Sequence, residues 1–276
     1  MNNPEFYRRL IDEELDKLFK AIKDDCEPIL YDAISYSILN RGKRLRPVLM
    51  CLVAESVGLD VDRIIMPALA LEMIHSYSLV HDDLPCMDND DFRSGKPTVH
   101  KKFGEDIAVL TGDGLLNLAM QTMLKAVLKD PSLAKACRLI ADCAGYQGML
   151  GGQILDMNPS ELNEDNVLNM YAKKTGALLD AAILAPLYVI GADDDTIKKY
   201  KKFSEATGFA FQISDDLLDY EKEKSEGKVT YATINGYNET KQAIESYKEI
   251  ILNTLRELNN TEIIEKYVIG IIDRAE

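Results

Sequence analysis

The sequence predicts an all-α protein built as one bundle of many helices. Apolar residues recur at three- and four-residue spacing through nearly every segment, and the alternation typical of β-strands is almost absent. The 276 residues show no tandem repeat and no low-complexity stretch that would mark linked modules. We therefore expect a single domain over residues 1–276, with any ligand cavity among its facing helices.

Five helices are expected in the first half of the chain. In the first, Leu15, Phe19 and Ile22 share one apolar face. The second is expected to end at Asn40-Arg41-Gly42, where a glycine can take the C-cap conformation. The expected ranges are residues 5–24, 28–40, 44–58, 64–84 and 105–128.

Five further helices follow in the second half. Asp130-Pro131 separates two of them, and Gly191-Ala192-Asp193 offers a C-cap followed by a new N-cap. The segments around residues 64–84, 105–128 and 205–219 are apolar on most faces, which places them at the centre of the bundle. The remaining expected ranges are residues 132–151, 164–190, 195–221, 238–258 and 261–274.

The composition indicates a soluble protein whose main partner is not a nucleic acid. Acidic residues outnumber basic ones by 46 to 32, whereas binding to phosphate backbones needs a basic surface. The polar start lacks the apolar core of a signal peptide, and no later segment is expected to reach membrane-spanning length uninterrupted. We therefore expect a cytoplasmic protein with no membrane partner. Free thiols are expected rather than a disulfide framework or a zinc site, because no CxxC pair occurs among Cys26, Cys51, Cys86, Cys137 and Cys143.

An acidic cluster ends the apolar run Gly208–Ile213. Asp215 and Asp219 are four residues apart and so project from one helical face, with Asp216 beside them. Two carboxylates about 4 Å apart repel by roughly 4 kcal/mol at an effective dielectric constant near 20, so a cation is the economical explanation. Carboxylate oxygens, water and a substrate phosphate are the ligands that Mg²⁺ prefers, and Mn²⁺ is a possible substitute.

A second acidic cluster, earlier in the chain, has a different spacing. Asp82 and Asp83 are followed by Asp88, and Pro85 between them predicts a distorted turn rather than a regular helix. Solvated aspartates at a helix end are an equally good reading of either cluster alone. Two such clusters, each ending an apolar helix, favour metal binding.

Basic residues provide a second way to bind an anion. Gly42-Lys43-Arg44-Leu45-Arg46-Pro47 leads into a helix, Arg93 lies close to Lys96 and His100, and Lys173-Lys174 precedes Thr175. A solvated loop is the plainer interpretation of any one group, but their number favours an anionic substrate. The glycine-rich run Gly148–Gln153 follows no strand, so close helix packing explains it better than dinucleotide binding. His75 and His81 are six residues apart, which is the wrong spacing for a zinc pair on one helical face.

Together these motifs resemble the trans-prenyl diphosphate synthases, and particularly the bacterial short-chain farnesyl diphosphate synthases (geranyltranstransferases). The segment Glu72–Asp91, with Arg93 and Gly95-Lys96-Pro97-Thr98, is similar to that family's first aspartate-rich motif. The other motifs follow in the family's order, and the resemblance spans roughly residues 40–232; these motifs are Gly151-Gly152-Gln153 with Asp156, Lys174-Thr175-Gly176, and Gln212 before the Asp215–Asp219 cluster.

The resemblance implies an isoprenoid-synthase bundle with a central substrate cavity. The implied reaction is the magnesium-dependent head-to-tail (1′-4) condensation of isopentenyl diphosphate with dimethylallyl or geranyl diphosphate, giving farnesyl diphosphate (C15) and diphosphate. It also implies a homodimer formed through central helices.

The resemblance further implies a role for individual residues. Lys174, Thr175 and Gln212 are expected to stabilise the allylic cation, and Lys174 to contact the allylic diphosphate as well. The expected metal ligands are Asp82, Asp83, Asp88, Asp215, Asp216 and Asp219, of which Asp82, Asp83, Asp88 and Asp215 are also counted as catalytic. The expected substrate-binding residues are Lys43, Arg46, His75, Arg93, Lys174, Gln212 and Lys228.

Chain length is expected to depend on Tyr77 and its neighbour Ser78. Tyr77 comes five residues before Asp82, about 7–8 Å deeper along a helix, so its ring could form the floor of the cavity. In this respect the sequence resembles the family members that produce farnesyl diphosphate, which have an aromatic residue at this position. A plain core role for Tyr77 is the alternative.

The sequence departs from the family pattern at two places. Ser94 stands where a second arginine is usual, and a hydroxyl cannot replace a bidentate guanidinium contact. The segment between Asp219 and Gly227-Lys228 is shorter than usual and lacks one lysine, for which Lys222 or Lys224 could substitute. Other possible functions are a geranyl or geranylgeranyl diphosphate synthase, a class I terpene cyclase, and a weakly active or regulatory synthase subunit.

Overall fold

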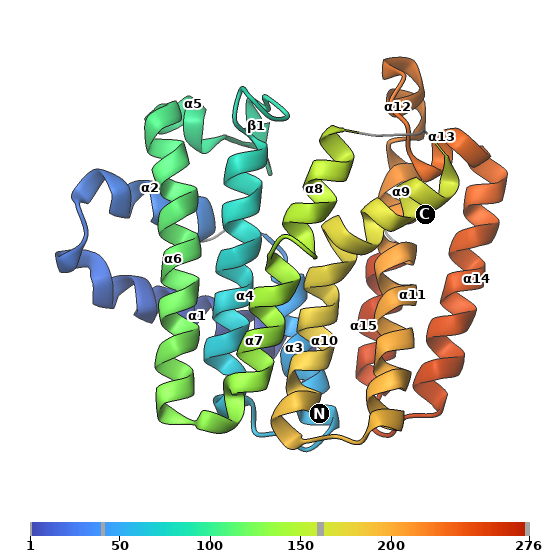
Figure 1. The fold of residues 1–276 in the computed structure, drawn as a ribbon, viewed down its shortest axis with the longest axis horizontal. Coiled ribbons are helices and arrows are strands. Elements are labelled where there is room, and N and C mark those ends of the chain that lie inside the picture. The colour runs from blue at the N-terminus through green and yellow to red at the C-terminus, as the bar shows by residue number, and fades with distance from the viewer. Residues whose placement is uncertain (1, 40–41, 159–162, 274–276) are drawn as a thin grey trace. The chain divides into compact units, whose positions relative to one another are not determined.

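The computed structural model of the chain describes residues 2–39, 42–158 and 163–273. These residues are mainly helical, with a single two-stranded hairpin among them, which confirms the predicted all-α class (Figure 1). They form two compact units: an N-terminal unit of Asn2–Cys51 and Asp60–Ala134, and a C-terminal unit of Leu52–Leu59 with the chain from Lys135 onward. We describe each unit by itself, and the expected single domain stays a prediction.

In the N-terminal unit, helix α4 lies beside helix α6 (Figure 1). α4 buries residues on most of its faces, as its nearly continuous apolar sequence predicts. Gly112 of α6 allows a close approach, because a Cβ atom there would lie 2.0 Å from His81 Nε2 of α4. The α-helices and strands that begin in this unit are α1 (Pro4–Ile22), α2 (Pro28–Ile38), α3 (Leu45–Ser56), α4 (Val61–Asp82), β1 (Phe92–Arg93), β2 (Lys96–Pro97), α5 (Val99–Phe103) and α6 (Glu105–Lys129).

Arg44 is the polar link of this unit. Its guanidinium is 3% exposed and donates hydrogen bonds to Asp12 of α1, Glu72 of α4 and the carbonyl of Ile38. A buried guanidinium needs several acceptors to replace its water, so these bonds join α1, α2 and α4 at one point. Of the three basic residues around the start of α3, Arg44 therefore has a structural role.

In the C-terminal unit, α11 contacts α10 on one side and α14 on the other (Figure 1). A π-helical segment, Ala172–Gly176, lies between α9 and α10 and contacts α8 and α11. The helices that follow α6 are α7 (Ala134–Ala144), α8 (Met149–Met157), α9 (Glu164–Tyr171), α10 (Ala177–Ile190), α11 (Asp194–Leu218), α12 (Tyr220–Glu226), α13 (Tyr231–Asn235), α14 (Tyr237–Arg256) and α15 (Glu262–Ile272).

Glycines bring backbones together around the π-helical segment. A Cβ atom on Gly152 of α8 would lie 2.2 Å from the backbone nitrogen of Lys174. A Cβ atom on Gly208 of α11 would lie 3.3 Å from the Cα atom of Gly176. The prediction that the Gly148–Gln153 run serves close packing is therefore confirmed.

Most expected helices are present, but three were drawn too long. The range 132–151 is interrupted after Ala144, the range 164–190 contains the π-helical segment, and the range 195–221 ends at Leu218 before a separate α12. α5, α13 and the β1–β2 hairpin were not predicted. The expected stop at Asn40-Arg41 lies outside the described residues. The five cysteines are free thiols, as predicted.

Helices α4 and α6 are long and apolar enough, by length and composition alone, to span a membrane. The expectation that no segment would reach that length is therefore wrong. In α4, 67% of the apolar window is buried within the structure, and core helices of soluble proteins pass the same test. The two helices are weak support for a membrane span, and the absence of a membrane partner stays a prediction.

We expect Gly152→Ala to destabilise the protein, because its methyl group must push α8 away from the backbone of Lys174. Overpacking of this kind lowers the free energy of unfolding by about 1–3 kcal/mol. The matched control is Gly270→Ala in α15, where a Cβ atom meets nothing within 4 Å and the helix should gain up to about 1 kcal/mol. Denaturant unfolding of both variants tests this, and equal stability of the two would contradict it.

Candidate active site

The first aspartate cluster sits where α4 ends. α4 stops at Asp82, and the chain then turns so that the N–H of Asp88 donates to the carbonyl of Asp82 at 2.8 Å. A bond from the N–H of Met87 to the carbonyl of Leu84 closes the turn around Pro85. The predicted distorted turn is confirmed, and it brings Asp88 back towards the end of the helix.

The carboxylate of Asp83 is bonded to the side chain of Arg93. The Asp83 side chain is buried, and Arg93 donates to its Oδ1 from Nε at 2.7 Å while Nη2 lies at 2.6 Å. Burial raises the pKa of Asp83, although the Arg93 guanidinium acts in the opposite direction. Asp83 therefore holds Arg93 in place.

A two-residue hairpin presents Arg93. Ser94 and Gly95 connect β1 to β2 with φ values of 51° and 73°, the left-handed conformation that such a tight turn needs at both positions. A serine in place of an arginine at position 94 thus lies at the tip of a turn. The sequence reasoning overlooked this hairpin, although Ser-Gly is a recognised turn signal.

Three of the expected anion-binding residues lie in one electrostatic neighbourhood. Desolvation, followed by the guanidinium groups of Arg46, Arg93 and Arg44, lowers the pKa of His75 well below its usual value. His75 is therefore neutral at pH 7 and can contribute hydrogen bonds rather than charge. Arg46 is buried, whereas Lys43 is exposed.

The second aspartate cluster occupies the last turn of α11. The N–H of Asp219 donates to the carbonyl of Asp215 at 3.2 Å, so the two residues are one helical turn apart, as predicted. Asp216, which follows Asp215 in the chain, is buried and accepts a hydrogen bond at each carboxylate oxygen. Tyr171 Oη donates to Oδ2 at 2.6 Å, and Gln212 Nε2 lies 3.2 Å from Oδ1. Burial raises the pKa of Asp216 to about 6, although both hydrogen bonds oppose the shift.

Lys174 and Thr175 lie on the π-helical segment. Thr175 Oγ1 donates to Gln212 Oε1 at 2.8 Å, and Lys174 forms an ion pair with Asp156 of α8. π-Helical turns are rare and are found frequently at functional sites. The structure therefore brings together Thr175, Gln212 and Asp216, three residues that the resemblance selected from distant parts of the sequence.

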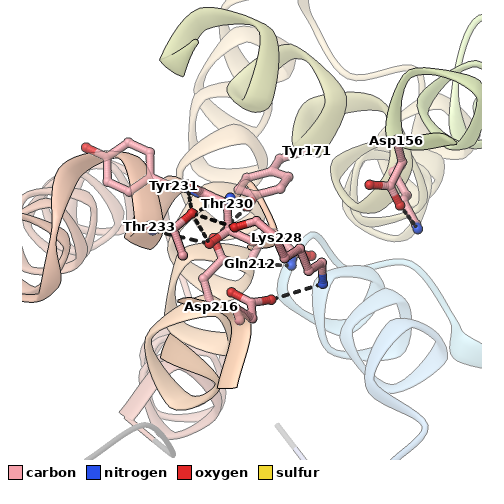
Figure 2. A network of polar contacts seen from close by, with 10 residues as sticks. Asp156, Tyr171, Gln212, Asp216, Lys228, Thr230, Tyr231 and Thr233 are labelled. Atoms are coloured by element: carbon pink, nitrogen blue, oxygen red, sulfur yellow. Dashed lines mark hydrogen bonds and ion pairs between the residues drawn. The ribbon is translucent and has the colours of Figure 1, made fainter. Parts of the chain in front are cut away.

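The shortened segment after Asp219 forms the short helix α12. Gly227 ends it in the left-handed conformation, and Lys228 Nζ then donates to Glu223 Oε1 of α12 at 3.0 Å (Figure 2 draws the surrounding network). Lysine has three donors, so Lys228 can hold Glu223 and still bind a phosphate oxygen. Lys222 and Lys224 are exposed on α12.

Two residues that the sequence reasoning missed belong to this network. Tyr171 is buried and lies one turn before Lys174, and Glu223 is buried beside Lys228. The only sequence signal for Tyr171 is its helical spacing from Lys174. No signal marked Glu223, because a carboxylate in a charged helix reads as a solvated residue.

The carboxylates suit magnesium in their chemistry. Mg²⁺ takes oxygen ligands and keeps several waters or substrate phosphates, so one or two carboxylates from each cluster suffice. Within the described residues, no group of three or more acidic, histidine or cysteine side chains is arranged to hold a metal ion on its own. Asp83 and Asp216 are buried and bonded to protein donors, so part of their capacity to accept bonds is already used within the protein. Magnesium binding stays a prediction for all six aspartates.

Comparison with known proteins identifies the family. Residues 27–267 match the family model described as polyprenyl synthetase. Geranylgeranyl pyrophosphate synthase 7 of Arabidopsis thaliana is 39% identical over 233 residues, covering 78% of this chain and 67% of the relative. Large subunit 1 of a heterodimeric geranylgeranyl pyrophosphate synthase from the same plant is 39% identical over 240 residues, covering 79% of this chain and 65% of the relative. The chain thus spans about two thirds of the length of these relatives.

A solved structure extends the likeness over the whole fold. The FPP/GFPP synthase of Zymomonas mobilis is 28% identical with a TM-score of 0.86, and the match covers 98% of this chain and 99% of that one. The chain therefore belongs to the polyprenyl synthetase family, and so to the prenyltransferases. The family and fold that the motifs predicted are confirmed.

Asp216 should make the metal-free protein less stable as the pH rises from about 4 to 6. Its carboxyl ionises near pH 3.8 in the unfolded chain and near pH 6 in the folded protein. Between these two pH values, ionisation stabilises the unfolded chain but not the folded protein, so the free energy of unfolding falls. The difference corresponds to at most about 3 kcal/mol. Urea unfolding at a series of pH values measures it, and Asp216→Asn should lack this part of the slope. An identical slope in both proteins would contradict the prediction.

Proposed function

We propose that the protein catalyses the head-to-tail condensation of isopentenyl diphosphate with an allylic diphosphate in a magnesium-dependent reaction. The observation that supports this most strongly is the pair of aspartate clusters, each at the end of a long helix and each with one aspartate anchored to protein donors. The neighbourhood of Arg46, His75 and Arg93 supports an anionic substrate. Family membership supports the reaction class.

Two different sets of residues are proposed to bind the two diphosphate substrates. Lys43, Arg46 and His75 bind isopentenyl diphosphate, with His75 acting as a neutral hydrogen-bonding group. Arg93, Lys174 and Lys228 bind the allylic diphosphate. When bound to Asp82, Asp88, Asp215 and Asp219, magnesium supplies Lewis-acid stabilisation of the departing diphosphate.

The allylic cation is stabilised by fixed dipoles. The hydroxyl hydrogen of Thr175 is donated to Gln212, so the Thr175 oxygen keeps its lone pairs for a positive centre. Buried Asp216 in turn fixes the amide of Gln212. Such preorganised groups lose no free energy to reorientation during the reaction.

The product length has two supported candidates. The curated relatives are named as geranylgeranyl pyrophosphate synthases, which favours a C20 product over the C15 product expected from the sequence. Tyr77 favours C15: it is 4% exposed on an unbroken stretch of α4, so its ring lies about 7–8 Å along the helix from Asp82. Its neighbour Ser78, whose hydroxyl donates to the carbonyl of His75, is proposed to affect product length as well.

Tyr77→Ala should lengthen the main product by at least one C5 unit if Tyr77 forms the floor of the cavity. Chromatography of the dephosphorylated products measures the change. Tyr200→Ala, at a buried tyrosine of the C-terminal unit outside the site network, controls for a general loss of packing. An unchanged product from Tyr77→Ala would contradict this role and would leave Tyr77 a plain core residue.

The reaction itself is tested with labelled isopentenyl diphosphate and either dimethylallyl or geranyl diphosphate, with and without magnesium. We expect turnover that depends on both magnesium and isopentenyl diphosphate. A class I terpene cyclase would turn over the allylic substrate alone. A regulatory subunit would show no turnover without a partner chain. Magnesium-independent turnover would contradict the proposal.

We also propose a cytoplasmic homodimer formed through α6. This helix exposes Leu110, Leu124 and Leu128 at 53%, 64% and 85% of their surface, and their spacing places all three on one face of the helix. Light scattering of the purified protein gives the mass, and Leu124→Glu with Leu128→Glu should reduce it to that of one chain.

A further inference from the structure

The hydroxyl group of Tyr171 joins three segments of the C-terminal unit. Tyr171 ends α9, and its Oη donates to Asp216 Oδ2 of α11 at 2.6 Å. The same oxygen accepts a hydrogen bond from the backbone N–H of Tyr231, the first residue of α13, at 3.2 Å. Figure 2 shows Tyr171 beside both partners. The side chain is 4% exposed, so these bonds replace water that the hydroxyl has lost.

The Tyr231 end of this bridge belongs to the loop that carries Lys228. The N–H of Lys228 donates to the carbonyl of Glu223, and Thr233 Oγ1 donates to the carbonyl of Lys228, both at 2.9 Å. A capping box between Thr230 and Thr233 then starts α13. The loop is thus built as one unit from α12 to α13, and Tyr171 links this unit to the aspartate helix.

The Asp216 end of the bridge continues to the π-helical segment. Asp216 Oδ1 accepts from Gln212 Nε2, and Gln212 Oε1 accepts from Thr175 Oγ1. Since an ionised carboxylate only accepts, the direction of every bond in this chain is fixed. One hydroxyl group therefore acts on both the Lys228 loop and the amide of Gln212.

We propose that Tyr171 is a positioning residue that ties the Lys228 loop to the second aspartate cluster and so limits the access of water to the allylic substrate. This inference rests on the proposed function. In condensation and in hydrolysis alike, the bond between C1 and the diphosphate oxygen breaks and the diphosphate keeps the electron pair. C4 of isopentenyl diphosphate then bonds to C1, and a proton leaves its C2; in hydrolysis, a water oxygen bonds to C1 and that water loses a proton. A loosened loop increases the share of the second outcome.

Two pairs of variants isolate the bridge. Tyr171→Phe removes only the hydroxyl, and its control is Tyr200→Phe, a buried tyrosine of the same unit whose hydroxyl lies 3.3 Å from Ser56 Oγ. Tyr231→Pro removes the N–H donor at the first position of a helix, where proline is tolerated, and Thr230 ahead of it already has extended backbone angles. Its control, Tyr231→Ala, removes the same side chain but keeps the N–H.

Four measurements are made on each variant. Hydrogen exchange of peptides covering residues 220–235, in the absence of metal and substrate, reports whether the loop is held. The ratio of prenyl alcohol to condensed product reports hydrolysis against condensation. The KM values for the two substrates are measured separately, and circular dichroism checks folding.

Tyr171→Phe and Tyr231→Pro should both speed exchange in this segment, raise the hydrolysis ratio and raise the KM for the allylic diphosphate by about tenfold, roughly the value of one lost hydrogen bond. The KM for isopentenyl diphosphate should stay unchanged, and both controls should behave as the wild type. Tyr171→Phe that matches Tyr200→Phe, or Tyr231→Pro that matches Tyr231→Ala, would overturn the inference. A wild type without turnover would instead refute the proposed function, while the exchange measurement would still show whether Tyr171 holds the loop.

Discussion

A carboxylate that is removed from water must gain hydrogen-bond donors, and each aspartate cluster of this protein is organised around one such group. Asp83 and Asp216 are each 3% exposed. Asp83 is held by Arg93, and Asp216 by Tyr171 and Gln212. In both clusters the buried residue is the second of two adjacent aspartates, so the same position of each pair is anchored to protein donors.

These two anchors organise the residues around them. Asp83 holds the arginine of the hairpin, and Arg93 in turn contributes to the positive environment of His75. Asp216 holds Tyr171, which reaches the Lys228 loop. Each anchor therefore fixes a donor in a defined place: the Arg93 guanidinium in one cluster and the Tyr171 hydroxyl in the other.

Backbone contacts position the remaining part of the site. Gly152 lets α8 lie directly against the backbone of Lys174, and Gly208 lets α11 approach Gly176. Because backbone contacts leave no room for side-chain adjustment, the π-helical segment is held firmly between α8 and α11. Thr175 therefore meets Gln212 at a fixed distance, which suits two groups expected to face the same cation.

The sequence by itself determined the helical class, most helix ranges, the turn at Pro85, the shared face of Asp215 and Asp219, and the family. Periodicity and fixed spacing are local properties, and the chain carries them in any environment. The tertiary structure alone decided that Arg44 joins three helices through its hydrogen bonds and that Arg46, from the same basic loop, helps to lower the pKa of His75. It also decided that Ala172–Gly176 forms a π-helix and that Tyr171 and Glu223 join the site. These outcomes depend on which donors and acceptors meet after burial, and residues far apart in the chain supply them.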